Sequence, residues 1–372
     1  MDQCTCGYHW RLGNKFVKQE YVYKYLGMEL DTQLTQEEFR KRIHDKARRN
    51  VSRVWSMGMR HGSLSVLAGI NLYKALVRSI LEYGAEVWKG IKWEEGERVQ
   101  REMGRRILRC HGKTTNEAVM GELGWWTLRT RRDFLKLKCW IKISLMEDAK
   151  LVRKVYQLSR EQYSTRRTQN WCFEVHKLLI RYGLEHLWRD ENMIKNPGVG
   201  NQSGSVQKHW EGVLFAKVQQ KEEEVWQKVC AKKRKLRTYV TFKNKLALEK
   251  YLLSEKEKQG RYLLTRLRTG TNKLRIETGR WKRPVEAEHQ RICLHCGNGE
   301  IENELHFLLR CNRYQQLREE MFGAIQTTNN TSLEGKSEQE QWQTLMSGEK
   351  KPGLVSDCRK KFVRKAMRLR ET

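Results

Sequence analysis

Proline and long apolar runs are both scarce in this chain, and each shortage limits the possible folds. Only three of the 372 residues are proline, which favours long helices because proline breaks the interior of a helix. No apolar run approaches the roughly 20 residues of a membrane-spanning helix. Residues 1–11 also lack the apolar core of a secretory signal. We therefore expect a mainly α-helical protein with no membrane span, located in the nucleus or the cytoplasm.

The cysteines show no general pairing pattern. Ten are present, and most are scattered, which together with the missing secretory signal indicates reduced thiols inside a cell. Cys4, Cys6 and His9 lie close together near the start but lack a fourth metal ligand. We interpret Cys4 and Cys6 as free thiols, with a second metal site as the alternative.

One later stretch does have metal-ligand spacing. Residues 293–311 follow the pattern C-x2-C-x9-H-x4-C. The candidate ligands are Cys293, Cys296, His306 and Cys311. Three thiolates and one imidazole complete a tetrahedron around Zn²⁺ and leave no open position for water, so we predict a structural zinc ion. Gly297 and Gly299 help to close the turn, and His289 or His295 is an alternative to His306 as the fourth ligand.

The charge of the chain is strongly positive. It has 74 Lys and Arg against 44 Asp and Glu, a formal net charge of +30. This excess favours a polyanionic partner, first nucleic acid (RNA, DNA or both) and second an anionic membrane surface. Residues 232–237, Lys-Lys-Arg-Lys-Leu-Arg, are typical of a nuclear-localisation or phosphate-binding cluster. A solvated helix face is the alternative.

Several basic segments also carry aromatic side chains, which suits nucleic-acid binding. Basic groups neutralise phosphates, and aromatic rings stack on unpaired bases. The candidate contacts are Lys24, Tyr25, Arg49, Arg53, Arg98, Arg101, Arg105, Arg106, Arg266, Arg268, Lys273, Arg275 and Arg280. The alternative is that these residues form solvated faces of surface helices, with the aromatic rings in the core.

Local patterns predict the main elements. Residues 21–26 alternate with a two-residue period typical of a strand. Thr35 precedes Glu38 by three residues, the spacing of a capping box, and this predicts a helix that begins near Gln36. Leu72, Leu76 and Ile80 step by four within an amphipathic stretch at 65–88.

We expect five regions along the chain. They are a strand segment at 1–35, a helical bundle at 36–158, a helical linker at 159–260 with a loop at 196–205, a basic segment with the zinc module at 261–323, and a flexible loop with a basic C-terminal helix at 324–372. Residues 114–128 are rich in turn formers and are expected to be a connector. The polar composition after residue 324 is the basis for the predicted flexible loop.

Five segments together resemble one family. Residues 23–27, 72–88 and 116–125 look like the region that follows the polymerase palm in non-LTR (LINE-type) retrotransposon reverse transcriptases. Residues 264–281 and the stretch at 293–311 are similar to the C-terminal part of these elements, so about half of the chain is covered. The resemblance implies a primer-gripping turn at 23–27, a thumb-like bundle at 36–158 and a C-terminal zinc knuckle.

The chain departs from this family in two respects. A reverse transcriptase palm holds two Mg²⁺ ions with carboxylates, usually in a Tyr-x-Asp-Asp turn, and the sequence contains no Asp-Asp pair. Nine residues separate Cys296 from His306, where the short retroviral knuckle has four, which suggests a structural clamp. We expect a region without palm, endonuclease or catalytic residues, which does not extend a primer by itself. The alternatives are part of an active RNA-directed DNA polymerase joined to an upstream palm, a non-functional relic, or a helical module that binds proteins or membranes.

Overall fold

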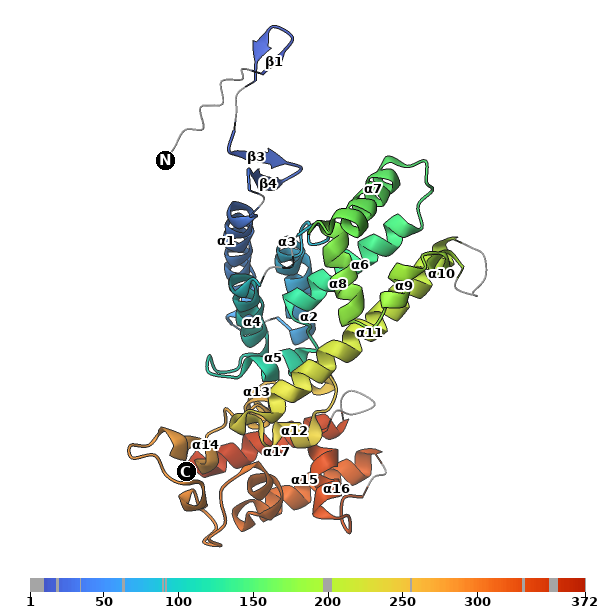
Figure 1. Cartoon of the computed structure of the whole chain (residues 1–372). Helices are drawn as coiled ribbons and strands as arrows, with labels where there is room; N and C mark the ends of the chain where they lie inside the picture. Colours follow the sequence, from blue (N-terminus) through green and yellow to red (C-terminus); the bar gives the residue numbers. More distant parts are fainter. Residues whose placement is uncertain are drawn as a thin grey trace.

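The structure is a computed structural model, and it confirms the mainly helical prediction (Figure 1). It describes residues 10–17, 20–33, 35–61, 64–88, 90, 92–196, 203–254, 256–329, 332–347 and 354–371. Cys4, Cys6 and His9 lie outside these residues. No helix within the described ranges has both the length and the apolar character needed to cross a membrane.

The predicted N-terminal strand forms part of two short hairpins. Strands β1 (Arg11–Leu12) and β2 (Lys15–Phe16) pair antiparallel, as do β3 (Val22–Tyr25) and β4 (Met28–Asp31). The backbone turns between β3 and β4 at Leu26 and Gly27, both with positive φ (45° and 79°), as the tight two-residue hairpin turn requires. Figure 1 shows both hairpins projecting beyond the end of the first helix.

Helix α1 (Glu37–Val54) begins one residue after the predicted position, but its predicted cap is wrong. Gln36 adopts a left-handed conformation and its side chain caps nothing. The hydroxyl of Thr35 instead donates to Asp31 at 2.8 Å, and this carboxylate also accepts the backbone N–H of Thr35 at 2.9 Å. Asp31 therefore organises the turn into α1.

Helices α1 to α5 form an N-terminal body. The predicted amphipathic stretch contains α2 (Val66–Leu72), a π-helical turn at Tyr73–Arg78 and α3 (Ser79–Leu81). Helix α4 (Glu94–Leu108) follows. Residues 114–128 were expected to be a turn-rich connector, which is wrong, because α5 (Asn116–Leu123) occupies its centre.

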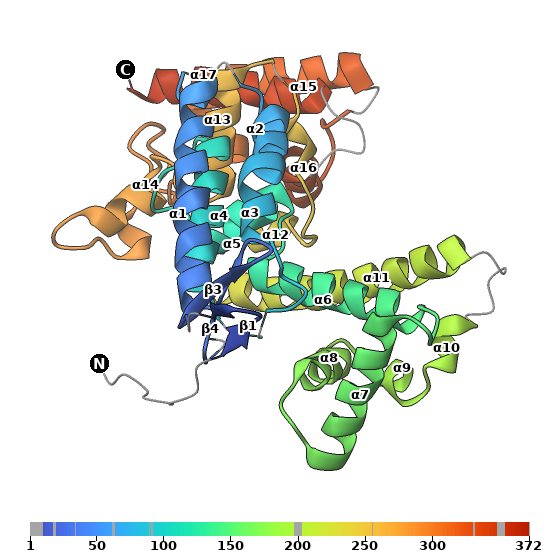
Figure 2. The ribbon, with the colours of Figure 1, turned by 90° about the horizontal axis from the view of Figure 1, so that it is seen from above.

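Lateral helices α6 to α11 extend to one side of this body (Figure 2). The long helices are α6 (Leu128–Ser144), α7 (Leu151–Arg166), α8 (Trp171–Arg181) and α11 (Ser203–Ala231), with α9 (Glu185–Arg189) and α10 (Asn192–Lys195) between the last two. Helix α11 packs along α6 and leads back towards the body. The boundary predicted at residue 158 lies inside α7, so the helix continues through this position.

The C-terminal lobe contains the remaining helices. These are α12 (Tyr239–Phe242), α13 (Lys258–Arg268), α14 (Arg275–Thr278), α15 (Gln315–Asn329), α16 (Glu338–Met346) and α17 (Leu354–Glu371). Helix α17 packs against both α13 and α15. The flexible loop predicted after residue 324 is wrong where the structure describes it. Helix α15 continues to Asn329, and α16 buries Trp342, Leu345 and Met346.

Candidate metal centre and basic surfaces

Four side chains of the C-terminal lobe converge on one point. They are Cys293, Cys296, His306 and Cys311, and their nearest ligand atoms all lie within 4.8 Å of one another. The Sγ atoms of Cys293 and Cys311 are 3.9 Å apart, and Sγ of Cys296 is 3.5 Å from Nε2 of His306. A tetrahedral ion with metal–sulfur bonds of about 2.3 Å separates its sulfur ligands by about 3.8 Å. The cluster can therefore hold one metal ion, and its donor set is compatible with zinc.

A short antiparallel bridge between Ile292 and Ile301 closes the metal loop. The backbone N–H of Cys293 donates to the carbonyl of Glu300 at 2.7 Å. Gly297 and Gly299 both have positive φ (71° and 69°) in the turn between them, a conformation that side chains other than glycine rarely adopt. The two glycines thus allow the tight turn that the sequence predicted.

His306 is the histidine of this cluster; His289 and His295 are not part of it. It lies on a π-helical turn, His306–Arg310, and its side chain is buried. While Nε2 faces the thiols, Nδ1 lies 3.1 Å from Oε2 of Glu300. A carboxylate on the second nitrogen fixes the tautomer and orientation of a metal-binding imidazole. Glu300 precedes the histidine by six residues, and its role was not predicted from the sequence.

Burial of the thiols favours their neutral form when no cation is present. It raises the pKa of Cys311 to about 12, and it also raises the pKa of Cys293. A cation at the centre of the cluster would supply the charge that makes the thiolates favourable. Because three sulfur atoms and one nitrogen complete a tetrahedron, the arrangement suits a structural site and not a catalytic one.

Buried ion pairs attach the metal loop to the rest of the lobe. Glu302 accepts two hydrogen bonds from Arg370 of α17, at 2.8 and 2.9 Å. Glu304 is fully buried and lies 3.1 Å from Arg237, which precedes α12. The ring of Phe307 packs against that of Phe362, with centroids 6.0 Å apart. The metal loop is therefore an integral part of the lobe.

A groove of about 560 Å³ lies beside the C-terminal half of α4. We call it the arginine groove, and its principal residues are Trp55, Arg98, Glu102, Arg105, Arg106 and Arg109. The guanidinium of Arg106 lies 5.1 Å from the centroid of Trp55 and also pairs with Glu102 at 2.6 Å. Arg98 is exposed and has no hydrogen-bond or ion-pair partner among the described residues. The sequence predicted Arg98, Arg105 and Arg106 here but missed Trp55 and Arg109.

Two of the predicted contacts on α4, Arg101 and Arg105, already have partners within the protein. Arg101 pairs with Glu94. Arg105 donates to the carbonyl of Thr114 at 2.9 Å and to Oδ1 of Asn116 at 2.6 Å, so it holds the loop that precedes α5. Arg105 therefore has a structural role whether or not it also meets a ligand.

The predicted contacts near the N-terminus are on the surface. Lys24 and Tyr25 are exposed on β3, and Arg49 and Arg53 are exposed on α1. Figure 1 shows the β3–β4 hairpin at one end of α1, whereas Arg49 and Arg53 belong to the last turns of this helix. The structure therefore does not gather these four residues into a single site.

One predicted nucleic-acid contact, Arg268, is wrong because the side chain is buried in the core. Arg268 is 1% exposed and lies against the carboxylates of Glu122 and Glu249, at 2.9 and 3.0 Å. Its guanidinium is fully engaged in the core and cannot reach a phosphate. Arg275 and Arg280 are half-buried and pair with Glu286 and Glu277.

The predicted nuclear-signal cluster at 232–237 is also partly engaged. Lys233 pairs with Glu117, and Arg237 pairs with both Glu277 and Glu304. Lys235 is half-buried, and its ammonium group donates to the carbonyl of Lys113 at 2.9 Å. Much of the cluster thus joins the C-terminal lobe to the body.

The comparisons with known proteins give no family. No family model, curated protein or solved structure matches this chain. The resemblance to non-LTR reverse transcriptases therefore rests on the segments at 23–27, 72–88, 116–125, 264–281 and 293–311 alone, and it stays a hypothesis.

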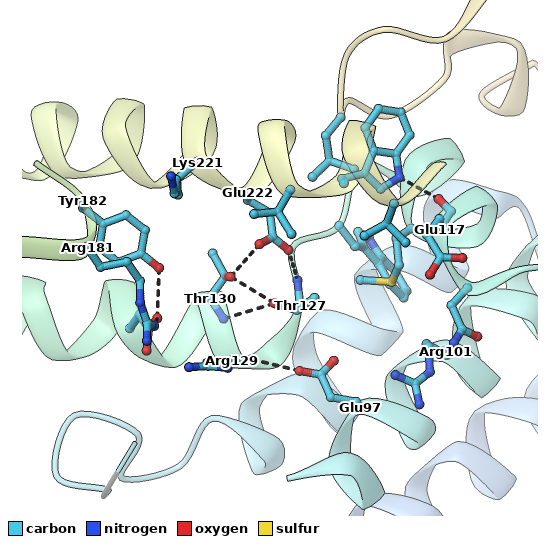
Figure 3. Close-up of a pocket in the computed structure, with 18 residues that line it drawn as sticks. Glu97, Arg101, Glu117, Thr127, Arg129, Thr130, Arg181, Tyr182, Lys221 and Glu222 are labelled. Atoms are coloured by element: carbon cyan, nitrogen blue, oxygen red, sulfur yellow. Dashed lines mark hydrogen bonds and ion pairs between the residues drawn. The ribbon is translucent and has the colours of Figure 1, made fainter. Parts of the chain in front are cut away.

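A further cavity of about 520 Å³ lies between α4, α6 and α11 (Figure 3). Its carboxylates already have partners. Glu97 accepts the backbone N–H of Arg129 at 3.0 Å, and Glu222 accepts that of Thr127 at 2.8 Å. Burial raises the pKa of Glu97. These carboxylates hold the start of α6 in place, which is a structural role.

Proposed function

We propose that this chain is a nucleic-acid-binding region related to the part of non-LTR reverse transcriptases that follows the palm. The arginine groove carries the proposal, because it combines cationic side chains with an aromatic ring that is partly exposed. A nucleic acid supplies both phosphates for the guanidinium groups and bases that stack on an indole. The formal net charge of +30 adds a long-range attraction for the same partner.

Three arginines of the groove have separate roles in this proposal. Arg98 is exposed, has no partner within the described ranges, and can neutralise a phosphate. Arg106 lies over Trp55 and can exchange its half-buried pair with Glu102 for a phosphate. Arg109 is held by Tyr262 and by the carbonyl of Arg60, at 2.8 and 2.9 Å, and it connects α4 to α13. Such contacts give affinity with little sequence specificity, because they are made to the phosphate backbone of the nucleic acid and not to its bases.

The metal cluster supports the same proposal as a structural staple. We propose that Cys293, Cys296, His306 and Cys311 hold Zn²⁺, which would fold the loop that connects α14 to α15. Bound zinc contributes folding free energy and no chemistry in a four-ligand site of this kind. The loop then serves to position the surrounding helices.

A double variant of the arginine groove should test the proposal. Arg98→Gln with Arg106→Gln is expected to make the fall of log K with log salt less steep. The slope should shrink in magnitude by about 1.4–1.8, because each phosphate contact releases about 0.7–0.9 of a counterion. Affinities for single-stranded RNA, single-stranded DNA and duplexes would be measured by fluorescence anisotropy at several salt concentrations. The matched control, Lys154→Gln with Arg166→Gln, removes two exposed charges from α7 and should change the slope far less.

A slope equal to that of the wild type in the groove variant would show that these arginines are a solvated face. Equal loss in the groove and control variants would indicate that only net charge matters. Anionic vesicles provide a further arm, since binding to vesicles without binding to nucleic acid would favour a membrane-surface protein. Arg105 is left intact because its replacement would also disturb the loop before α5.

Replacing the aromatic ring separates stacking from charge. Trp55→Ala is expected to weaken binding to single strands by about 1–3 kcal/mol, the usual contribution of one stacked base. Binding to duplexes should change less, because paired bases are not available to stack on Trp55. The same anisotropy assay checks this, and equal losses on single strands and duplexes would contradict it.

A further inference from the structure

A second basic pocket lies between α13 and α17, with a volume of about 370 Å³. The cations that line it are Arg266, Lys273, Arg364 and Arg368, and the single acidic residue is Glu371. Glu371 already pairs with Lys273, and Arg364 pairs with Glu257 at 2.8 Å. The pocket therefore has more positive charge than the carboxylates around it neutralise.

Two arginines of this pocket lack partners among the residues that the structure describes. Arg368 is exposed and makes no hydrogen bond or ion pair. Arg266 is half-buried, and its Nε is shielded from solvent without an acceptor. A buried donor without an acceptor is costly. An anion in the pocket would supply that acceptor and would offset the unpaired positive charge.

We propose that this α13–α17 pocket binds a phosphate group of the nucleic acid through Arg266 and Arg368. Guanidinium groups suit this ligand because their planar array of N–H donors matches phosphate oxygens. The group is either a phosphodiester within the strand or a phosphate at a strand end. This inference rests on the proposed function, of which it specifies a second contact.

Helix α13 contributes to the pocket and also contacts an arginine of the arginine groove. Tyr262 lies four residues before Arg266, so both side chains are on the same face of the helix. Arg109 of the groove donates to the hydroxyl of Tyr262 at 2.8 Å. One strand can therefore occupy the groove, pass Tyr262 and place a phosphate in the pocket.

The test uses the full chain with Arg266→Gln and Arg368→Gln combined. Single-stranded oligonucleotides of one sequence would carry a 5′-hydroxyl, a 5′-phosphate or a 3′-phosphate. The variant is expected to bind about tenfold more weakly at low salt, and its salt dependence should be less steep by about 0.7, the value for one phosphate contact on a single strand. Arg266→Lys with Arg368→Lys keeps both charges and should retain most of the slope. The Lys154→Gln and Arg166→Gln control should lose far less affinity.

The oligonucleotide ends distinguish the two sources of phosphate. If the wild type prefers a phosphorylated end and the glutamine variant loses that preference, the pocket takes a terminal phosphate. If all three oligonucleotides lose affinity equally, it takes a phosphodiester. Thermal unfolding of each variant shows whether the fold is kept. If the glutamine variant is unfolded, the lysine variant is compared with the wild type instead, by measuring the binding of inorganic phosphate.

Failure of the pocket can be distinguished from failure of the proposed function. The pocket proposal alone is contradicted if the glutamine variant of the pocket keeps the affinity and salt slope of the wild type while the Arg98→Gln and Arg106→Gln variant loses affinity. If the wild type binds no nucleic acid, the proposed function fails, and titration with inorganic phosphate followed by ³¹P NMR still tests the pocket. Binding by the wild type that the glutamine variant loses supports it, and no binding by the wild type overturns it.

Discussion

Cys296→Ser is expected to abolish zinc binding and to unfold residues 291–317, while α2 and its neighbours in the N-terminal body stay folded. Structural zinc contributes on the order of 10 kcal/mol to the folding of small zinc peptides, far more than the about 1.5–3 kcal/mol from burying one large side chain such as Phe307. Without the ion, the raised pKa values of Cys293 and Cys311 leave neutral thiols that attract one another weakly.

Zinc per chain would be measured by mass spectrometry, and hydrogen exchange would locate the unfolding. His306→Ala should behave like Cys296→Ser. Glu300→Gln should keep the metal with about 10–100-fold lower affinity, since it removes only the carboxylate that orients His306. Cys139→Ser on α6 is the matched control for the loss of a thiol and should bind zinc as the wild type does.

Two results would contradict the site as described. A wild-type chain without zinc would reduce the cluster to a set of buried thiols. If His306→Ala binds zinc as tightly as the wild type, His306 is not the ligand, and His289 or His295 would be replaced next. Neither histidine belongs to the cluster in the structure, so such a result would also require a different conformation of the loop.

Arg268→Ala is expected to destabilise the protein by about 3–5 kcal/mol, the usual cost of removing one partner from a buried ion pair. Arg268 lies between Glu122 of α5 and Glu249, which follows α12, and both carboxylates are buried. Burial acts to raise the pKa of Glu249, but Arg268 and Lys243 lower it overall, so this carboxylate stays charged. The alanine variant leaves two negative charges in the core with too few cations.

The same network joins the C-terminal lobe to the N-terminal body. Arg268 ends α13, Glu122 lies on α5, and the guanidinium also donates to the carbonyl of Met346 at the end of α16. We therefore expect Arg268→Ala to loosen the lobe from the body as well as to lower its stability. Urea unfolding followed by circular dichroism measures the free energy, and limited proteolysis reports on the connection.

Arg189→Ala is the matched control for this prediction. Its pair with Glu185 is exposed at 2.8 Å, and exposed pairs contribute at most about 1 kcal/mol. If Arg268→Ala lowers the free energy of unfolding by no more than about 1 kcal/mol, the role given to the network is contradicted. An effect as large in Arg189→Ala would show that the measurement does not separate buried from exposed pairs.

Local sequence patterns were sufficient to predict those features that depend on residues close together in the sequence. The step of four through Leu72, Leu76 and Ile80 predicts a helix because one face of a helix repeats at that spacing. The metal ligands could be identified because their spacing lies within one short stretch, where the chain has few ways to bring them together. Even there, the π-helical turn at His306–Arg310 and the carboxylate of Glu300 were not predicted.

The predicted loop after residue 324 shows where composition misleads. Its polar residues suggested flexibility, yet α16 forms there and buries Trp342 against Phe242, with ring centroids 6.1 Å apart. A few apolar side chains in a polar segment are enough for a helix when another element covers them. Phe242 is 100 residues earlier in the chain, so the local sequence does not contain this information.

Composition and local spacing by themselves determined that the protein is helical, strongly basic and equipped with four candidate metal ligands in one stretch. Only the tertiary structure decided what each basic residue does. Arg266 and Arg268 are two positions apart on α13, yet one lines an open pocket and the other is buried against Glu122, 146 residues away in sequence. A guanidinium stays in the core only where folding brings carboxylates to it, and that pairing depends on packing between α5 and α13, which no short stretch of sequence records.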